Sequence, residues 1–458
     1  MDTTTTTTST GGRVFISGVT VQFVGGRLLL TQLMGLDTQP HNHAPDVLYS
    51  TDLTARRAII NQSRSVIYRT FSDIIANERS RIQDRVVRAR LTLRRLRPAM
   101  MRARAEIFPN VPHNLAGLTN ILRDPAWQNL SRTKDLEGSM YLRSVWGNDG
   151  SHNIIFISWR SLELMKQVPI LFADGTFYIA PSIDGCYQVF TLVAVYGHTV
   201  IPLCWCLMER KTEAAYVAVL TYLRNHMVRW NFIRVVCDFE DAIINAFTRV
   251  FGVQVQGCLF HSAHAMVQHA KVTIGIAVLN QFPEVKLIVH LCCALPLSPQ
   301  HLLQHGLNVI GAVAMDLEDV LYMTQLRPFL EFIQFQWLHH VNRGRTLSVC
   351  GSDHRTNNAS ESNNRSMKRK FGVHHPNIFR FIRELAEFEE VAMDDLQSLN
   401  LGIIPSRHRA VSAICNDAHI QELTSALLQG VPTDDRIIAF LTYASHSVSE
   451  IVNDALDV

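Results

Sequence analysis

Three apolar runs follow one another through the middle of the chain, at residues 171–180, 187–197 and 199–208. They are rich in β-branched and aromatic residues, and short turn segments that contain Gly185 and Gly197 separate them. Strands joined by such short turns pair with their neighbours in sequence. The pattern therefore predicts an antiparallel meander of three strands.

Helical and strand-like patterns alternate after the meander. We expect a helix at 213–229, a strand at 233–238, a helix at 240–250 and a last strand at 253–260. With the meander before them and a helix after them, the order is β-β-β-α-β-α-β-α. This is the order of an RNase H-like fold, an α/β mixed sheet with three antiparallel strands, two parallel strands and helices on both faces. In that order the first and fourth strands are neighbours.

The flanking segments are mostly helical. Apolar residues recur at three-to-four spacing over residues 52–97, which predicts a helix that ends at Pro98. The other elements that we expect are a hairpin at 13–31, a connector with one short helix at 108–140, a strand at 153–157, a short helix at 161–167, a mostly helical stretch at 262–350 and a helical region at 376–457.

Composition supports a globular intracellular protein. Hydrophobic residues make up 47% of the chain and charged residues 18%, and the mean hydropathy is only +0.07. No apolar run reaches the roughly 20 residues that a membrane helix needs, and the start, MDTTTTTTST, lacks the features of a signal peptide. The nine cysteines form no regular framework, so we expect reduced core thiols.

Arginine is concentrated in the predicted helical segment. Between Arg56 and Arg104 there are fourteen arginines, no lysine and three acidic residues, a net charge of about +11. A solvated helix face is the alternative, but this excess is more than solubility requires. We favour contact with nucleic-acid phosphates, which arginine binds through paired hydrogen bonds. The candidates are Arg85, Arg88, Arg94, Arg95 and Arg97.

Two aspartates lie at the ends of predicted neighbouring strands. Asp174 follows the first strand in FADGTF, and Asp238 ends the fourth in VVCDFEDA. Taken singly, Asp174 could accept hydrogen bonds in a turn, and Asp238 could cap the next helix. Taken together they converge on one edge of the sheet, where two carboxylates repel unless a divalent cation separates them.

A third acid, Glu361, lies in HRTNNASESNNRSMKRKF. Capping of a helix that begins near Asn357 would account for it alone. With the two aspartates it supplies a third oxygen ligand from a helix beside the sheet. Four basic residues follow and are candidates to hold substrate phosphates, with a solvated helix face or a nuclear-import patch as alternatives. These are Arg365, Lys368, Arg369 and Lys370.

Two further groups have metal-ligand spacing. Cys258 and His261 form a Cys-x-x-His pair at the end of the last predicted strand, as zinc ligands do, although two more ligands are not evident. A structural role at a strand–helix junction is the alternative. His41 and His43 look like half of a zinc site, but no cysteine precedes them, which argues against zinc there.

The motifs FADGTF, VVCDFEDA, GCLFH and RTNNASES, with the strands between them, resemble in order the conserved blocks of Mutator-like (MULE) transposases over residues 150–390. The resemblance implies a catalytic triad of Asp174, Asp238 and Glu361 that binds two Mg²⁺ or Mn²⁺ ions and cuts and joins DNA phosphodiesters. The Cys258–His261 pair takes the place of the family's Cys-x-x-His block.

The segment HNHAP at 41–45 resembles the end of a FLYWCH zinc finger whose cysteines are absent here. The domains that we expect are a disordered tail at 1–12, a degenerate FLYWCH-like segment at 13–50, a basic DNA-binding region and connector at 51–150, the core at 151–270, a helical insertion at 271–350, the catalytic Glu helix at 351–390 and a C-terminal helical region at 391–458.

The resemblance implies transposon ends and target DNA as partners, a homo-oligomer, no membrane, and location in the nucleus. The main alternative is a domesticated protein that keeps the fold and binds DNA without cutting it. A third interpretation is a nuclease for RNA or hybrids, which the large insertion before Glu361 disfavours.

Overall fold

The computed structural model describes residues 46–65, 69–133, 140–226, 232–317, 322–340, 343–403 and 411–457, together with three short strands near the start of the chain. The predictions for the 1–12 tail and for His41 and His43 lie outside the described residues. The three strands are β1 (Val14–Ile16), β2 (Val19–Val24) and β3 (Arg27–Leu29), paired antiparallel in the order β1-β2-β3. They contain the hairpin expected at 13–31.

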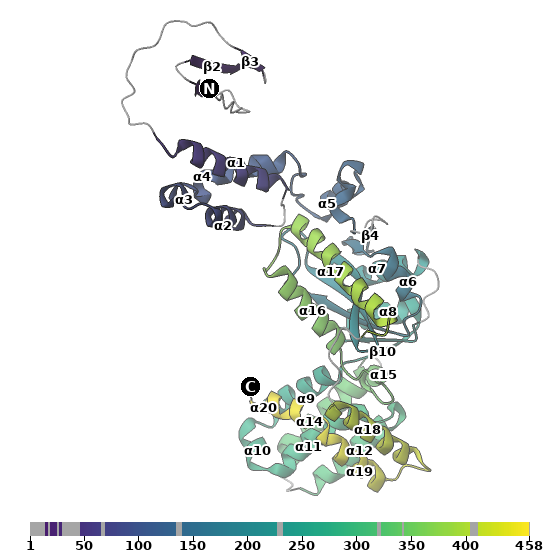
Figure 1. Cartoon of the computed structure of the whole chain (residues 1–458). Helices are drawn as coiled ribbons and strands as arrows, with labels where there is room; N and C mark the ends of the chain where they lie inside the picture. The colour runs from purple at the N-terminus through teal and green to yellow at the C-terminus, as the bar shows by residue number, and fades with distance from the viewer. Residues whose placement is uncertain are drawn as a thin grey trace. The chain divides into compact units, whose positions relative to one another are not determined.

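A seven-stranded mixed sheet forms the core of the α/β part of the chain (Figure 1). The order of its strands is β10-β9-β6-β7-β8-β5-β4. Its strands are β4 (Tyr141–Trp146), β5 (His152–Phe156), β6 (Ile170–Thr176), β7 (Gln188–Tyr196), β8 (Thr199–Met208), β9 (Arg234–Cys237) and β10 (Gln254–Gln256). β6, β7 and β8 form the expected antiparallel meander, and β9 and β10 run parallel to β6.

The predicted neighbourhood of the first and fourth strands is confirmed. β6 pairs directly with β9, with Ala173 opposite Cys237. Both Gly185 and Gly197 have positive φ, which the turns between the meander strands require and which glycine adopts without steric cost. The sequence did not predict β4, which adds an antiparallel edge strand beside β5.

Helices cover both faces of the sheet. On one face, α6 (Trp159–Met165), α7 (Glu213–His226) and α8 (Asp241–Phe251) bury apolar residues such as Leu220 and Phe247. On the other, α5 (Leu115–Arg123), α16 (Asn358–Phe371) and α17 (Ile378–Asn400) pack against strand residues that include Trp205. The 3₁₀ helix η1 (Pro125–Ser131) follows α5.

The last predicted strand was too long. We expected a strand over 253–260, but β10 ends at Gln256 and a helix begins at Leu259, with Cys258 as its N-cap. Residues 253–256 alternate apolar and polar side chains as a strand does, but the apolar residues that follow, at 258–260, cannot by themselves distinguish a buried strand from a buried helix turn. Gly257 lies where they meet, and a Cβ there would come within 2.1 Å of the Phe239 ring.

A second apolar core lies outside the sheet, in a part that we call the helical domain. Its helices are α9 (Leu259–Thr273), α10 (Ile276–Gln281), α11 (Pro283–Ala294), η2 (Leu295–Leu297), η3 (Gln300–Leu302), α12 (Leu303–Met315), the π-helix η4 (Tyr322–Leu326), α14 (Arg327–Phe332), the π-helix η5 (Ile333–His339), α15 (Arg343–Leu347), α18 (Val411–Leu428), α19 (Asp434–His446) and α20 (Ser449–Asp457).

The C-terminal helices do not form a region of their own, as the division at residue 391 had suggested. Ile420, Leu441 and Val452 are buried in the same cluster as residues of α9, α11 and α12. The segment after α17 therefore completes the core that the helices after β10 begin. No helix among the described residues combines the length and the apolar character that crossing a membrane demands.

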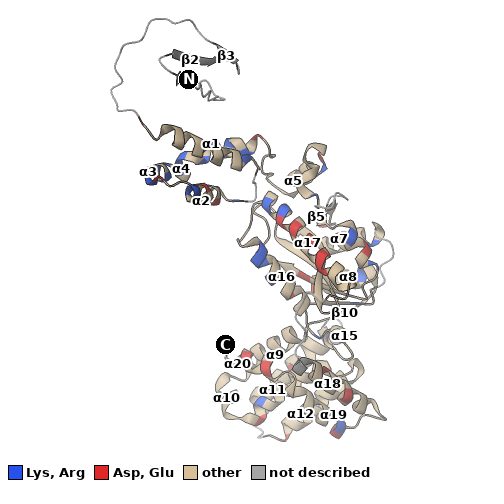
Figure 2. Cartoon of the chain, in the orientation of Figure 1, with Lys and Arg blue, Asp and Glu red and all other residues tan. Residues whose placement is uncertain are grey.

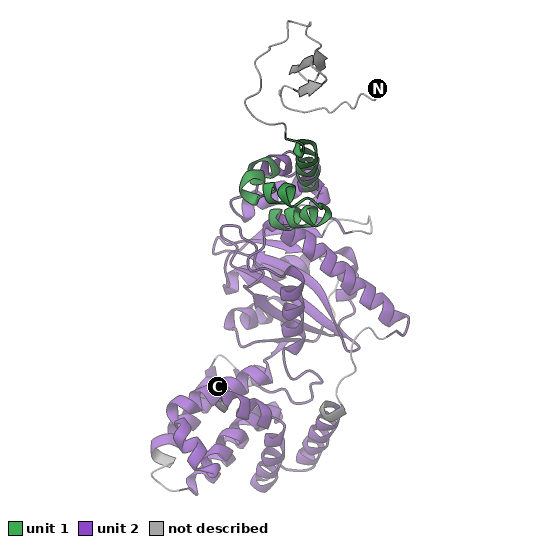
Figure 3. Ribbon diagram, turned by 60° about the vertical axis from the view of Figure 1, so that its left-hand side comes forward, with its two compact units in different colours: residues 1–62, 71–100 green, residues 63–70, 101–458 purple. Residues whose placement is uncertain are grey.

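Contacts divide the chain into two compact units, residues 1–62 with 71–100 and residues 63–70 with 101–458 (Figure 3). The prediction of one continuous helix over residues 52–97 is wrong, because four separate helices occupy this segment. These are α1 (Tyr49–Ser65), α2 (Phe71–Arg81), α3 (Arg85–Arg90) and α4 (Leu93–Ala105). Pro98 lies inside α4 rather than after its end.

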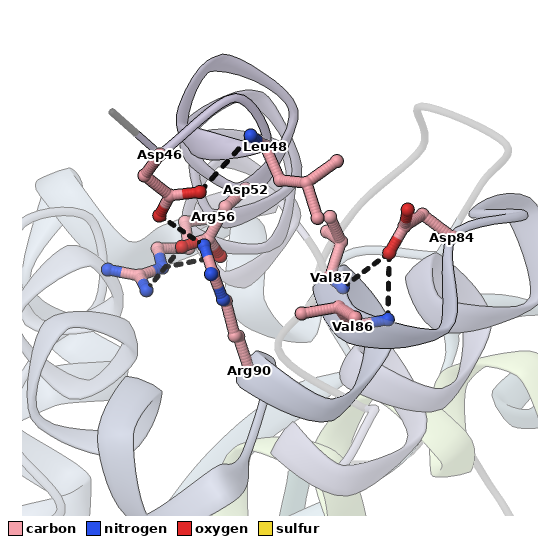
Figure 4. A network of polar contacts seen from close by, with 8 residues as sticks. All are labelled: Asp46, Leu48, Asp52, Arg56, Asp84, Val86, Val87 and Arg90. Atoms are coloured by element: carbon pink, nitrogen blue, oxygen red, sulfur yellow. Dashed lines mark hydrogen bonds and ion pairs between the residues drawn. The ribbon is translucent and has the colours of Figure 1, made fainter. Parts of the chain in front are cut away.

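Polar contacts begin and fasten these short helices (Figure 4). Asp84 accepts hydrogen bonds from Val86 N at 2.7 Å and Val87 N at 3.0 Å, which starts α3. Arg90 pairs with Asp46 at 2.5 Å, and the Arg90 guanidinium lowers the pKa of that carboxyl.

We expect Leu441→Ala to reduce the free energy of unfolding by roughly 2–5 kcal/mol, because Leu441 is fully buried between helices that are distant in sequence. Leu428→Ala is the matched control, since 47% of that side chain is exposed, and we expect a change of at most about 0.5 kcal/mol. Urea denaturation followed by circular dichroism measures both. Equal effects would show that α19 does not belong to the core.

Candidate active site

The two predicted aspartates lie side by side on one face of the sheet. The register that places Ala173 opposite Cys237 brings Asp174 of β6 next to Asp238, which directly follows β9. Side chains alternate between the faces of a strand, so Asp174 points to the same side as Phe172, and Asp238 to the same side as Val236. Phe172 and Val236 pack with Ala359 of α16. Both carboxylates therefore face the helix that carries Glu361.

Two asparagines tie α16 to these carboxylates. Asn364 Nδ2 donates to Asp174 Oδ2 at 2.6 Å, and Asn357 Nδ2 donates to Asp238 Oδ1 at 3.1 Å. Asn357 Nδ2 also lies 3.4 Å from the Ala173 carbonyl oxygen. Asn357 occupies the N-cap position of α16, as expected from the sequence, but its side chain makes no capping hydrogen bond. Its amide connects the helix to both strands instead.

Burial and like charge perturb the ionisation of Asp174. Burial, followed by the negative charges of Asp238 and Glu361, raises the pKa of the Asp174 carboxyl to about 7. Hydrogen bonding from Gly175 N at 2.8 Å opposes this change but does not offset it. A carboxyl in this position is poised to lose its proton when a cation approaches.

The local explanations that the sequence left open account for little of this arrangement. The helix after Asp238 has Glu240 as its N-cap, and Asp238 bonds to Asn357 rather than to that helix. Asp174 accepts one hydrogen bond from its neighbour Gly175, as a turn residue would, but it lies within β6. Glu361 occupies the first turn of α16, where the helix dipole favours a negative charge.

Glu361 stands somewhat apart from the two aspartates. Within the described residues, Asp174, Asp238 and Glu361 do not have ligand atoms that all lie within 4.8 Å of one another. Glu361 Oε2 is 3.8 Å from Arg365, one turn further along α16. Three carboxylates repel one another, and the separation of Glu361 from the two aspartates reduces this repulsion.

Two of the buried polar atoms without a partner belong to the asparagines that contact the carboxylates. Among the described residues, Asn357 Oδ1 and Asn364 Oδ1 are buried and form no hydrogen bond, while the Nδ2 atoms of the same amides donate to Asp238 and Asp174. Ser360 Oγ of α16 is also buried and unpaired. Leaving such atoms unpaired destabilises a fold by about 1–3 kcal/mol each, so a ligand that the two amide oxygens could contact would be stabilising here.

Two residues at the start of α9, Cys258 and His261, lie close to Asp238. His261 Nδ1 lies 3.1 Å from Asp238 Oδ1. The ligand atoms of Asp238, Cys258 and His261 all lie within 4.8 Å of one another. The Asp238 carboxylate, followed by the Cys258 sulfur, raises the pKa of His261 to about 10. The sequence paired Cys258 with His261 but did not connect either of them with Asp238.

A second polar chain lies on the other face of β6, and the sequence analysis missed it. Gln188 Nε2 donates to Tyr216 OH at 2.7 Å, and Tyr216 OH donates to Glu240 Oε1 at 3.0 Å. Glu240 Oε2 pairs with Lys211 at 2.9 Å. The Gln188 amide lies against Gly175, where a Cβ would come within 2.5 Å of Gln188 Oε1. A glycine after Asp174 therefore gives this amide room.

The four basic residues that follow Glu361 separate into two groups. Arg365, Lys368 and Arg369 line a pocket of about 480 Å³ together with Tyr178, and Lys368 Nζ lies 4.4 Å from the centre of the Tyr178 ring. Lys370 points to α17, where it pairs with Glu387 at 2.8 Å and Glu384 at 3.4 Å. Figure 2 shows the basic residues of α16 and the acidic residues along α17.

The predicted arginines of the first unit lie on α3 and α4. Four of them are exposed and Arg88 is half-buried. The exposed ones are Arg85, Arg94, Arg95 and Arg97. In the same unit Arg56 pairs with Asp52 at 2.6 Å, so part of the charge of this segment is neutralised internally.

Comparison with protein-family models and with curated proteins found no match to this chain.

We expect Asp174→Asn to stabilise the metal-free protein at pH 7. The folded protein raises the pKa of this carboxyl from 3.8 to about 7, so its stability falls as pH rises across that interval, and the amide removes the loss. Because Asp174 keeps some contact with solvent, we expect a gain of roughly 1–3 kcal/mol.

Urea denaturation in EDTA at pH 4 and pH 7 measures this gain. The control is Asp454→Asn on α20, an exposed aspartate, for which we expect no such pH-dependent gain. A loss of stability on Asp174→Asn at pH 7 would contradict the raised pKa of the Asp174 carboxyl in the folded protein.

Proposed function

We propose that this protein is a DDE-type DNA transposase of the Mutator-like class, in which Asp174, Asp238 and Glu361 form the catalytic centre. The observation that carries the proposal is the convergence of acids from three separate elements on one face of the sheet, with two of them on adjacent parallel strands. We propose further that β6 to β10 form an RNase H-like core. Their order of 5-4-1-2-3, counted from β6 as the first, supports it.

The donor set fits hard divalent cations. Carboxylate oxygens are the ligands that Mg²⁺ and Mn²⁺ prefer. Burial, followed by the negative charge of Asp238, raises the pKa of Asp174, and a bound cation would favour its ionised form. The amides of Asn357 and Asn364, which donate to the two aspartates, add unpaired oxygens beside the acids. Such ions would activate a water or a 3′-hydroxyl and stabilise the leaving oxygen of a phosphodiester.

The chain's own residues orient these acids and the substrate. Asn364 and Asn357 hold one oxygen of Asp174 and one of Asp238, which fixes the direction of the other oxygen. Glu361, Arg365 and Lys368 are spaced by four and three residues, so they share one face of α16. A DNA strand whose reacting phosphate meets the acids would therefore pass its next phosphates over Arg365, Lys368 and Arg369.

The exposed arginines of α3 and α4 suit a less specific task. They would bind DNA phosphates in a salt-dependent way and raise the overall affinity. Such a protein would act on DNA in the nucleus and, as transposases of this class do, as a homo-oligomer.

We expect the wild-type protein to nick a supercoiled plasmid in the presence of Mn²⁺. Asp174→Asn, Asp238→Asn and Glu361→Gln each remove one metal-binding oxygen, so nicking should fall by roughly 100-fold or more. DNA affinity, measured by fluorescence anisotropy, should change by less than about twofold, because the affinity comes from basic residues that contact phosphates and not from these acids. Asp454→Asn is the control and should keep full activity.

The outcome also separates the proposal from its rivals. Nicking that survives in all three variants would contradict this catalytic centre. If the wild type and the three variants all bind DNA in a salt-sensitive way but none of them nicks the plasmid, a domesticated protein that binds DNA and does not cut it would be favoured. Preference for RNA or an RNA–DNA hybrid over DNA would favour the nuclease.

We expect the triple change Arg365→Ala, Lys368→Ala and Arg369→Ala to weaken DNA binding and its salt dependence. The slope of log K against log salt should become shallower by roughly 2–3 units, since each phosphate contact contributes about 0.9. Lys370→Ala is the matched control on the same helix. Because Lys370 pairs with α17, its loss should leave the slope unchanged and lower stability by at most about 1 kcal/mol.

A further inference from the structure

We propose that Asp238, Cys258 and His261 form a binding site for one thiophilic divalent cation of the Zn²⁺ class, which shares Asp238 with the hard-cation site of the three acids but differs from it in its sulfur and nitrogen donors. Oxygen donors alone select Mg²⁺ or Mn²⁺, whereas a thiolate and an imidazole select zinc and similar soft ions. The proposal goes beyond transposition, because zinc binding would not depend on DNA.

The fold brings the three residues together from two neighbouring strands. β9 and β10 are parallel with Val236 opposite Gln256. Two residues further on, this register brings Asp238 at the end of β9 near Cys258 after β10. Cys258 is the N-cap of α9, and His261 follows three residues later, so both occupy the same face of the first helical turn.

The distances suit a tetrahedral ion. Bonds of about 2.0–2.3 Å place the ligand atoms of zinc roughly 3.3–3.7 Å apart. Asp238 Oδ1 and His261 Nδ1 are 3.1 Å apart, and the three ligand atoms all lie within 4.8 Å of one another. A small change in the Cys258 or His261 rotamer would close the set around one ion.

Two features of this place suit a set of metal ligands. His261 Nδ1 is buried and lies 3.1 Å from Asp238 Oδ1, so an imidazole nitrogen and a carboxylate oxygen are directed at each other. Cys258 Sγ is fully buried and accepts a hydrogen bond from Asn357 N at 3.3 Å, as metal-bound thiolates commonly do.

Asn357 serves as an outer ligand shell for this site. Its backbone N–H donates to Cys258 Sγ, and its side chain donates to Asp238 Oδ1. Outer partners of this kind orient the ligating atoms and raise metal affinity. The binding step itself is proton-balanced, because the cation replaces the protons of the Cys258 thiol and the His261 imidazolium, which are released to solvent.

Asp238 belongs to both sites, and this consequence rests on the proposed function. An ion held by Asp238, Cys258 and His261 places positive charge beside the three acids and engages one of their ligands. Zinc should therefore oppose the binding of Mn²⁺, which makes the soft site an inhibitory one.

Cobalt(II) is the probe for this site, since it takes zinc positions and a cobalt–thiolate bond absorbs in the near ultraviolet. We expect the reduced, metal-free full chain, in excess Mg²⁺ and without DNA, to take up one equivalent of Co²⁺ with such a band. Zinc should remove the band. Cys258→Ser should abolish it, and His261→Asn should weaken Co²⁺ binding by at least tenfold.

Cys415→Ser is the control, because Cys415 is the exposed cysteine among the nine. The cobalt–thiolate band should persist in this variant. Urea denaturation establishes that each variant is folded, and if Cys258→Ser is not, His261→Asn decides. No thiolate band in the wild type, or a band that survives Cys258→Ser, overturns the proposal. Cys258 and His261 would then only position Asp238.

The inhibitory consequence has a readout that needs no cleavage. Electron paramagnetic resonance of free Mn²⁺ should show that zinc releases bound Mn²⁺ from the wild type but not from Cys258→Ser. Equal retention in both would overturn the competition. A cobalt band without plasmid nicking would contradict the transposase alone, and nicking without a band would contradict the zinc site alone.

Discussion

The cost of holding carboxylates together at one edge of a sheet is the constraint on which this structure depends. Pairing β6 directly with β9 places Asp174 beside Asp238, and burial with mutual repulsion raises the pKa of Asp174. The surrounding polar residues interact with these carboxylates and offset part of this free-energy cost. Asn364 and Asn357 each donate to one of the aspartates from the same helix. The neighbouring helix α9 directs a histidine at Asp238. A sheet with apolar residues at these two positions would need none of these partners.

Much of the sheet was predictable because its pattern is simple. The meander and the strands around it are apolar runs divided by turn residues, and their order alone implied that β6 and β9 are neighbours. The positions of Asp174 and Asp238 followed from that. The role of Asn357 did not follow, because an asparagine before a helix is normally its cap, and nothing local reveals that its amide reaches two strands. The proximity of Cys258 to Asp238 was not predictable from the sequence either, because it depends on the residue at which β10 ends.

The helical segments show where periodicity fails. Four short amphipathic helices repeat the same apolar spacing as one long helix, so residues 52–97 looked continuous, although Asp84 starts a new helix within them. Lys370 looked equivalent to Arg365 in the sequence, but position on the helix turned it toward the acids of α17. In both cases the deciding fact is which side of a helix meets a partner, and that is settled by packing between segments distant in sequence.

The route of the chain has a consequence for how the protein is made. The backbone leaves the sheet after β10 for the helical domain, returns to the sheet with α16 and α17, and then goes back to complete the helical domain with α18, α19 and α20. Ribosomes deliver the chain from its N-terminal side, so the helical domain waits for α18, α19 and α20 until α16 and α17 have been made. Until then, the apolar surfaces of α9, α11 and α12 stay exposed, and chaperones can bind to them during this interval.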